Sequence, residues 1–169
     1  MTFSVRASKE IVVELIPNLG TEYFTFGMHK AEVRNKMKEI YGVDNHVARG
    51  EETECYFNNS LQFSYEDDET LTFIEISAPP PVFVTILGIK TWEIPGDLLL
   101  KLLCEKDIMN MEISGAGSNP IFEKTHIALW DLDKQYDHIG NYRVLKWGAI
   151  GIGDERYYNK ICSIWSQHR

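Results

Sequence analysis

The chain has 169 residues, of which 44% are hydrophobic and 25% are charged. This composition excludes a disordered tail and a membrane bundle, and the length suits one ordinary domain. Seventeen basic residues against 25 acidic ones leave a formal charge of -8, which argues against nucleic acid as a partner because phosphate contacts require a basic face.

The first quarter of the chain predicts a strand followed by a helix. Residues 11–16 are mostly apolar and β-branched, and Pro17 stops the strand that they predict. From about His29 to Tyr41, apolar side chains recur at helical spacing. Gly42 follows directly and suits a left-handed C-terminal cap.

Residues 53–77 predict an antiparallel meander of three strands. Apolar and polar side chains alternate there, so that Cys55 is expected to face inward while Glu54 and Tyr56 face outward. The acidic segment at residues 66–69 is expected to form the turn between the last two strands. The acids of this region would then lie at turns and on an open sheet face.

The second half of the chain repeats this order after the prolines at 79–81, which mark a linker or a sheet edge. A β-prone run at residues 82–86 precedes a helix that is expected to start near Pro95 and to end near Asp107. Further strands are expected at residues 110–114, 121–131 and 142–152. Apolar residues of the tail, residues 157–165, repeat the spacing of the first helix and favour a short helix.

Strands that follow one another with few crossover helices indicate an α+β fold. We expect an antiparallel sheet, the meander, with helices packed on one face. Residues 1–169 would form a single domain. The repeated order leaves open an architecture of two similar halves, residues 1–78 and 82–169.

The net charge is confined to one segment. No Lys or Arg occurs between Arg49 and Lys90, and the rest of the chain balances 17 bases against 17 acids. Residues 51–80 hold the eight remaining acids, which are Glu51, Glu52, Glu54, Glu66, Asp67, Asp68, Glu69 and Glu75. A segment of one sign raises the local potential and steers a basic partner. The alternative is a solvated acidic face that only keeps the protein in solution.

The cysteines and the apolar runs bear on the compartment. The three cysteines are widely spaced and form no Cys-x-x-Cys pair, which predicts neither a zinc cluster nor a disulfide framework. The apolar stretch at residues 11–13 is too short for a signal sequence. The longest uncharged run, residues 76–89, is too short to span a membrane. We expect a cytoplasmic protein with no metal, cofactor or membrane partner.

Sequence motifs identify no reaction. A Gly-x-Ser-x-Gly elbow is absent, and the Gly-Ile-Gly at 151–153 lacks the third glycine of a dinucleotide fingerprint and is expected to be a turn. An acid–base pair of His126 with Asp131, or of His138 with Asp137, keeps an enzyme open as an alternative.

Residues 26–33, Phe-Gly-Met-His-Lys-Ala-Glu-Val, resemble a recurrent bacterial helix opening, Phe-Gly-Met-Ser/Thr-x-x-Glu-Val. This opening occurs in small α+β domains that include β-lactamase-inhibitor-like modules and immunity-type proteins of toxin systems. In the motif the hydroxyl caps the helix, and the Glu three residues later completes a capping box. Here His29 replaces the hydroxyl residue, while Glu32 is retained.

As a whole, the small acidic chain resembles an immunity protein of a bacterial polymorphic-toxin or contact-dependent growth-inhibition system. The resemblance implies that it binds and blocks one cognate toxin domain, often a basic nuclease, with its acidic face as a phosphate mimic. The residues expected to line or border the partner surface are Glu51, Glu52, Glu54, Tyr56, Tyr65, Glu66, Asp67, Asp68 and Glu69. The alternatives are a structural or adaptor domain that binds another protein, and the enzyme with a His/Asp site.

Overall fold

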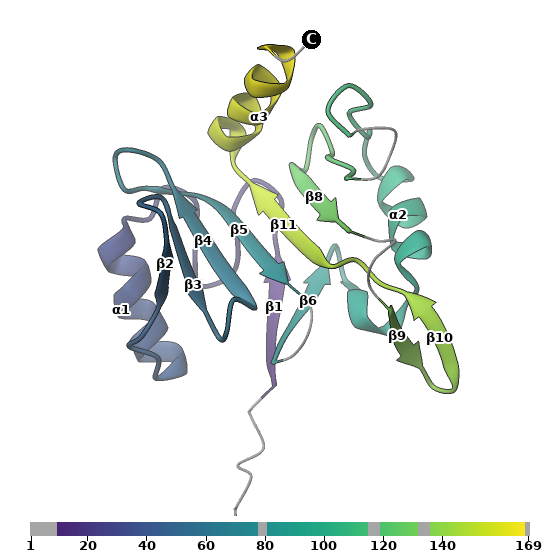
Figure 1. The fold of residues 1–169 in the computed structure, drawn as a ribbon, viewed down its shortest axis with the longest axis horizontal. Coiled ribbons are helices and arrows are strands. Elements are labelled where there is room, and N and C mark those ends of the chain that lie inside the picture. Colours follow the sequence, from purple (N-terminus) through teal and green to yellow (C-terminus); the bar gives the residue numbers. More distant parts are fainter. Residues whose placement is uncertain (1–9, 78–80, 115–118, 132–135, 168–169) are drawn as a thin grey trace, which may run out of the picture.

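The protein has the α+β fold that the order of elements predicts (Figure 1). The computed structural model describes residues 10–77, 81–114, 119–131 and 136–167. The helices are α1 (Lys30–Tyr41), α2 (Gly96–Cys104) and α3 (Glu155–Gln167), with a 3-10 turn η1 (Thr91–Glu93). The strands are β1 (Ile11–Leu15), β2 (Val47–Arg49), β3 (Thr53–Tyr56), β4 (Leu61–Tyr65), β5 (Leu71–Ser77), β6 (Val82–Ile86), β7 (Ile89–Lys90), β8 (Ile127–Trp130), β9 (Tyr136–Ile139), β10 (Tyr142–Leu145) and β11 (Ala149–Gly153).

The main sheet has six strands in the order β2-β3-β4-β5-β11-β8, and neighbouring strands are antiparallel. Its first four strands are consecutive in the chain, and β3, β4 and β5 form the predicted meander. Strand β11 comes from the end of the chain and lies between β5 and β8. A smaller sheet has the order β1-β6-β7, with β1 parallel to β6, and β9 and β10 form a hairpin.

The core lies on one face of the six-stranded sheet. Cross-strand partners share a face, and the core face carries Leu61, Phe63, Ile74, Ile76, Ile150 and Ile152. Buried side chains of α1, α2 and the small sheet belong to the same cluster, among them Val33, Met37, Leu99, Leu103 and Val84. Fully burying one such side chain contributes about 1.5–3 kcal/mol, so this face fixes how the sheet and the first two helices pack.

Helix α1 has the caps that the sequence suggests, with one change of chemistry. The Nδ1 atom of His29 accepts a hydrogen bond from the N–H of Ala31 at 3.2 Å. The imidazole therefore caps the helix in place of the Ser or Thr hydroxyl of the motif. Gly42 ends the helix with a φ of 68°, and its N–H donates to the carbonyl oxygen of Lys38.

Two of the expected strands are wrong or too long. Residues 110–114 form a turn, because the side-chain oxygen of Asn110 accepts the N–H groups of Glu112 and Ile113 at 3.0 and 3.4 Å. In the segment 121–131 only β8 is a strand. The residues before it turn around the carboxylate of Asp107, which also lies beyond the end of α2.

The expected strand over 142–152 divides into β10 and β11. Between them Lys146 turns inward, and its Nζ donates to the carbonyl oxygens of Trp92 and Ile94 at 2.8 and 2.5 Å. The indole of Trp147 donates to the carbonyl oxygen of Gly96 at 2.8 Å. These bonds tie the break in the strand to the start of α2. The tail is the helix α3, as expected, and Pro79 and Pro80 lie outside the described residues.

The sequence suggested a turn at residues 151–153, but Gly151 and Gly153 lie within β11. A Cβ atom on Gly151 would approach Cζ of Phe73 to 2.4 Å, and one on Gly153 would approach Cδ1 of Tyr157 to 2.6 Å. The rings of Phe73 and Tyr157 stack with centroids 4.0 Å apart. The two glycines therefore make room for the contact that anchors α3, and this contact lies on the sheet face opposite the core.

Candidate functional site

The two acidic turns of the sequence lie side by side at one end of the six-stranded sheet. Residues 50–52 connect β2 to β3 and residues 66–70 connect β4 to β5, and the N–H of Tyr65 donates to the carbonyl oxygen of Glu52 at 2.8 Å. Six carboxylates belong to these turns and are named here the acidic end: Glu51, Glu52, Glu66, Asp67, Asp68 and Glu69.

Two cations of α3 lie against the acidic end. The Nζ atom of Lys160 is 3.6 Å from the carboxylate of Glu52 and 3.4 Å from that of Glu66. Burial lowers the pKa of Lys160, but the charges of Glu66 and Glu52 together outweigh it and raise that pKa. Arg156 lies 3.5 Å from the carboxylate of Asp68. These contacts hold α3 over the end of the sheet (Figure 1).

The acidic end keeps an excess of negative charge in spite of these partners. Six carboxylates against three cations leave an excess of three (6 - 3 = 3), because Lys30 also lies there and donates to the carbonyl oxygen of Glu51 at 3.0 Å. His29 lies 3.3 Å from Glu69 and adds charge there only when protonated. Such an excess on one surface attracts cations at long range.

Three residues that were expected on the partner surface lie in the core instead. The expectation of exposure is wrong for Glu54, Tyr56 and Tyr65, whose exposed fractions are 1%, 2% and 2%. The register pairs Glu54 with Phe63, which places Glu54 on the core face, while Cys55 takes the opposite face. The inward and outward faces of β3 are thus the reverse of those that its alternation suggested.

Glu54 is the centre of a buried polar cluster beneath α1. Its carboxylate oxygens accept from Arg34, whose Nε lies at 2.7 Å, and from the two tyrosine hydroxyls at 3.2 Å. The charged or chargeable groups within 4.0 Å are Arg34, His46 and Lys30. The bond to Glu54 raises the pKa of Arg34. Basic residues on the polar side of α1 therefore compensate a carboxylate that faces the core, which fixes the helix on the sheet.

Burial raises the pKa of Tyr56 and of Tyr65, and the neighbouring charge of Glu54 raises both further. Both phenols consequently stay protonated and serve as donors to the carboxylate. Neither acts as an anchor at a surface in this structure.

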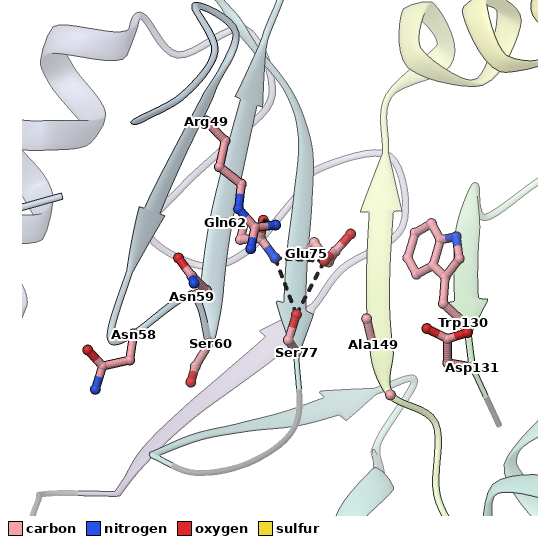
Figure 2. Close-up of a pocket in the computed structure, with 11 residues that line it drawn as sticks. Arg49, Asn58, Asn59, Ser60, Gln62, Glu75, Ser77, Trp130, Asp131 and Ala149 are labelled. Atoms are coloured by element: carbon pink, nitrogen blue, oxygen red, sulfur yellow. Dashed lines mark hydrogen bonds between the residues drawn. The ribbon is translucent and has the colours of Figure 1, made fainter. Parts of the chain in front are cut away.

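The opposite face of the same sheet holds an open hollow of about 400 Å³ (Figure 2). Side chains of β2, β4 and β5 line one side of it, and Trp130 at the end of β8 lines the other. Ala149 of β11 lies between Ser77 and Trp130 in the register. Its small side chain leaves the middle of the hollow bare.

A chain of hydrogen bonds crosses one side of the hollow and ends on Glu75. The side-chain amide of Gln62 donates to the Glu75 carboxylate at 2.7 Å and to the hydroxyl oxygen of Ser77 at 3.2 Å. The Ser77 hydroxyl donates to the same carboxylate oxygen at 3.2 Å, and Arg49 donates to the Gln62 side-chain oxygen at 3.2 Å. Figure 2 shows these side chains, which come from β2, β4 and β5.

The Glu75 carboxylate receives neutral donors and no direct ion pair among the described residues. Burial raises the pKa of Glu75, although the bond from Ser77, the charge of Arg49 and the bond from Gln62 act in the other direction. This carboxylate has lost part of its hydration through burial, and no described cation contacts it in return. This makes the hollow a second candidate site.

Of the two acid–base pairs that the sequence suggested, the structure describes the side chains of one, and that pair is not assembled. His126 and Asp131 stand at opposite ends of β8, separated by its four extended residues, or about 13 Å of strand. His126 instead stacks on Tyr158 with centroids 4.6 Å apart, and its Nδ1 atom is buried without a hydrogen bond in the described region. The side chains of Asp137 and His138 lie outside the described residues.

The described ranges contain neither a metal-binding cluster nor a membrane-spanning helix. No group of three or more His, Cys, Asp or Glu side chains is placed to hold a metal ion there. No helix in that part of the chain has the length and apolarity needed to cross a bilayer. The three cysteines are free thiols.

No known protein family, curated protein or solved structure matches this chain. The residues alone therefore have to support a function.

The sequence did not predict the hollow, although the polar face of two of its strands can be recognised from alternating positions. Gln62 and Ser64 on β4, and Glu75 and Ser77 on β5, are polar at alternate positions, which marks one strand face as non-core. Trp130 could not be added to that face, because it depends on the pairing of β8 with β11 and of β11 with β5.

Proposed function

We propose that this chain is an immunity-type inhibitor that binds and neutralises a cognate bacterial toxin domain in the cytoplasm. The toxin domain is of the basic nuclease class, and the chain presents carboxylates in place of the phosphates of its substrate. The observation that carries the proposal is the acidic end, where two turns that lie apart in the sequence meet with three negative charges in excess.

The physical argument is electrostatic complementarity. A nuclease domain needs a positive face to hold a phosphate backbone. An opposite patch on an inhibitor speeds encounter, and like-charged patches reject wrong partners. Glu51 and Asp67 suit this role, because both are exposed and neither has an ion-pair partner among the described residues. Their charge is available to a partner without the loss of an internal bond.

The test is capture followed by neutralisation. The tagged chain is used to capture partners from the cells of its source in low and in high salt, and each captured domain is expressed in a bacterial host with and without the chain. We expect a basic domain that is released by salt, stops growth when expressed alone and permits growth when the chain is present. Capture of no protein, or of a domain that is harmless or stays toxic beside the chain, contradicts the proposal.

A second candidate function is an adaptor or self-assembling domain, which the apolar side of α3 favours. Tyr158 accepts a hydrogen bond from Asn110 at 2.8 Å, which places this side of α3 beside residues 108–111. Met111 there is 64% exposed, and Trp165, two turns beyond Tyr158, is 49% exposed. Exposed aromatic residues of this kind are typical of interfaces.

This second function predicts concentration-dependent association. Sedimentation of the chain over a range of concentrations would show dimers or larger species, and Trp165→Ser would shift them to monomers. A monomer at every concentration, with no protein captured through α3, would contradict the adaptor function and leave the inhibitor as the remaining proposal.

A further inference from the structure

We propose that the hollow on the open sheet face is a receptor for one arginine side chain of the protein partner. The guanidinium would stack on Trp130 and pair with the carboxylate of Glu75. This inference rests on the proposed function, since it names a chemical group of the same partner. It concerns a different surface from the acidic end.

The shape of the hollow fits a flat group that enters from above the sheet. Strands β5 and β8 are separated by β11 alone, so their backbones lie about 10 Å apart. Ala149 fills little of the space between Ser77 and Trp130. The volume of about 400 Å³ lies within the range of about 300–1,000 Å³ that is usual for ligand pockets.

Trp130 supplies a stacking surface. Figure 2 shows its ring beside Ala149, across β11 from Glu75. The ring of Phe73 meets it edge to face, with centroids 5.7 Å apart, which holds the indole in place. Guanidinium groups stack on tryptophan faces, and tryptophan is the aromatic residue that attracts cations most strongly.

Charge determines the sign of the group that fits. Glu75 and Asp131 bring two negative charges to the lining, and Arg49 brings one positive charge. Arg49 donates to Gln62 and forms no ion pair with Glu75, and the donors that contact Glu75 are neutral. A cation at Glu75 would offset the burial that raises the pKa of this carboxylate. An arginine can donate to the second oxygen of this carboxylate, Oε2, while its flat guanidinium stacks on Trp130, a combination that a lysine does not offer.

The hydrogen bonds already present hold the receptor in a single shape. Gln62 and Ser77 both donate to the same oxygen, Oε1, of Glu75. These bonds restrain the rotamer of Glu75, and its second oxygen, Oε2, accepts no hydrogen bond from the described residues. The site is thus preorganised, which lowers the entropic cost of binding.

The experiment uses the full chain and a small probe, N-acetylarginine amide, so that no partner needs to be known. Binding is followed through the indole N–H signal of Trp130 in ¹H–¹⁵N NMR spectra. Matched probes are the N-acetyl amides of citrulline, which is neutral and nearly the same shape, and of lysine. We expect arginine amide to bind with a Kd of about 1–10 mM, about tenfold more tightly than citrulline amide.

Glu75→Gln removes the charge while it keeps an oxygen for Gln62 and Ser77, and it should weaken arginine binding about tenfold. The matched control Glu39→Gln, on the exposed side of α1, should leave binding unchanged. Ala149→Val should block the hollow by filling it. Unchanged binding to Glu75→Gln, equal binding of citrulline amide, or no shift of the Trp130 signal overturns the inference.

The outcome is independent of the test for the proposed function. If a toxin domain is captured and neutralised but its affinity is unchanged by Glu75→Gln and Ala149→Val, the receptor is wrong and the inhibitor stands. If arginine amide binds at Trp130 but no toxin domain is found, the receptor stands for an arginine-bearing partner of another kind.

Discussion

Glu54 and Glu75 are two carboxylates of the same sheet, on strands β3 and β5, and they face opposite sides. Glu54 is surrounded by Arg34, His46 and Lys30 and by two tyrosine hydroxyls, and its side chain is 1% exposed. Glu75 is partly buried beside a hollow and receives bonds from neutral groups. Basic side chains therefore contact Glu54, whereas no cation among the described residues contacts Glu75.

This difference indicates that the two carboxylates have different roles. A buried charge is tolerated when partners surround it, and its removal then leaves the partners uncompensated. A carboxylate that is partly buried without such a partner lowers stability, and natural proteins retain such costs mainly where activity needs them. On this argument Glu54 holds α1 in place, whereas we propose that Glu75 binds a cationic group of a partner.

The largest effect is expected from Glu54→Ala. Loss of this carboxylate leaves Arg34 and two buried phenols without their acceptor, and the free energy of unfolding should fall by about 3 kcal/mol. Urea denaturation measures the change. The control is Glu52→Ala, an exposed acid paired with Lys160, which should cost about 0.5 kcal/mol or less. Equal losses in the two variants would show that the buried cluster is not structural.

Gly151→Ala should have the next largest effect, a loss of about 2 kcal/mol, because the new methyl group meets the ring of Phe73. The change should displace Phe73 and with it Trp130, so that binding of arginine amide falls as well. Ala149→Val, on the same strand and face but within the hollow, should cost less than half as much stability in thermal denaturation. A larger loss of stability from Ala149→Val than from Gly151→Ala would mean that there is room for a methyl group at Gly151 and that the hollow is filled by packed side chains.

Glu75→Gln should raise the free energy of unfolding by about 0.5–1 kcal/mol at pH 7. Burial raises the folded-state pKa of this group above its ordinary value of 4.5. At pH values between the unfolded-state and the folded-state pKa, the folded chain therefore binds more protons than the unfolded chain. The stability of the native chain falls as pH rises through this range, and the variant loses this dependence of stability on pH. Urea midpoints of both proteins at pH 4 and pH 7 check it, and a variant that is less stable at pH 7 would refute the assignment of Glu75 as an unsatisfied carboxylate.

The smallest effect is expected from Lys160→Met. Its exposed pairs with Glu52 and Glu66 are each worth little, so the free energy of unfolding should fall by about 0.5 kcal/mol at low salt and by less at high salt. At the same time the acidic end would lose one of the two cations that α3 supplies and bind a basic partner faster. A loss comparable to that of Glu54→Ala would show that α3 is held mainly by these ion pairs and not by Tyr157.

The sequence predicted the local elements well where one pattern dominates. Helix α1 has a clean apolar stripe and a following Gly42, and the meander of β3 to β5 alternates with turns between its strands. The turn at residues 110–114 was missed because an Asn110 side chain outweighed β-prone neighbours, a competition that alternation alone does not reveal.

The candidate site was harder to predict, because its charges are paired by segments far away in the sequence. Residues 51–80 contain no base, yet the fold brings Arg34 to Glu54, and Lys160 and Arg156 to the acidic turns. In β3 three consecutive residues, Glu54 among them, are buried, so their alternation could not tell the two faces apart.

The measurement that tests the central claim most directly is the association rate constant of the captured toxin domain with charge-reversed chains. Glu51→Lys with Asp67→Lys changes two acids of the acidic end that have no internal ion pair in the described structure. Glu39→Lys with Glu105→Lys makes the same change of net charge at exposed sites outside it. The account predicts that the first pair slows association about tenfold or more and reduces its salt dependence, while the control pair has a much smaller effect. Equal rate constants for the two pairs would contradict an interface at the acidic end.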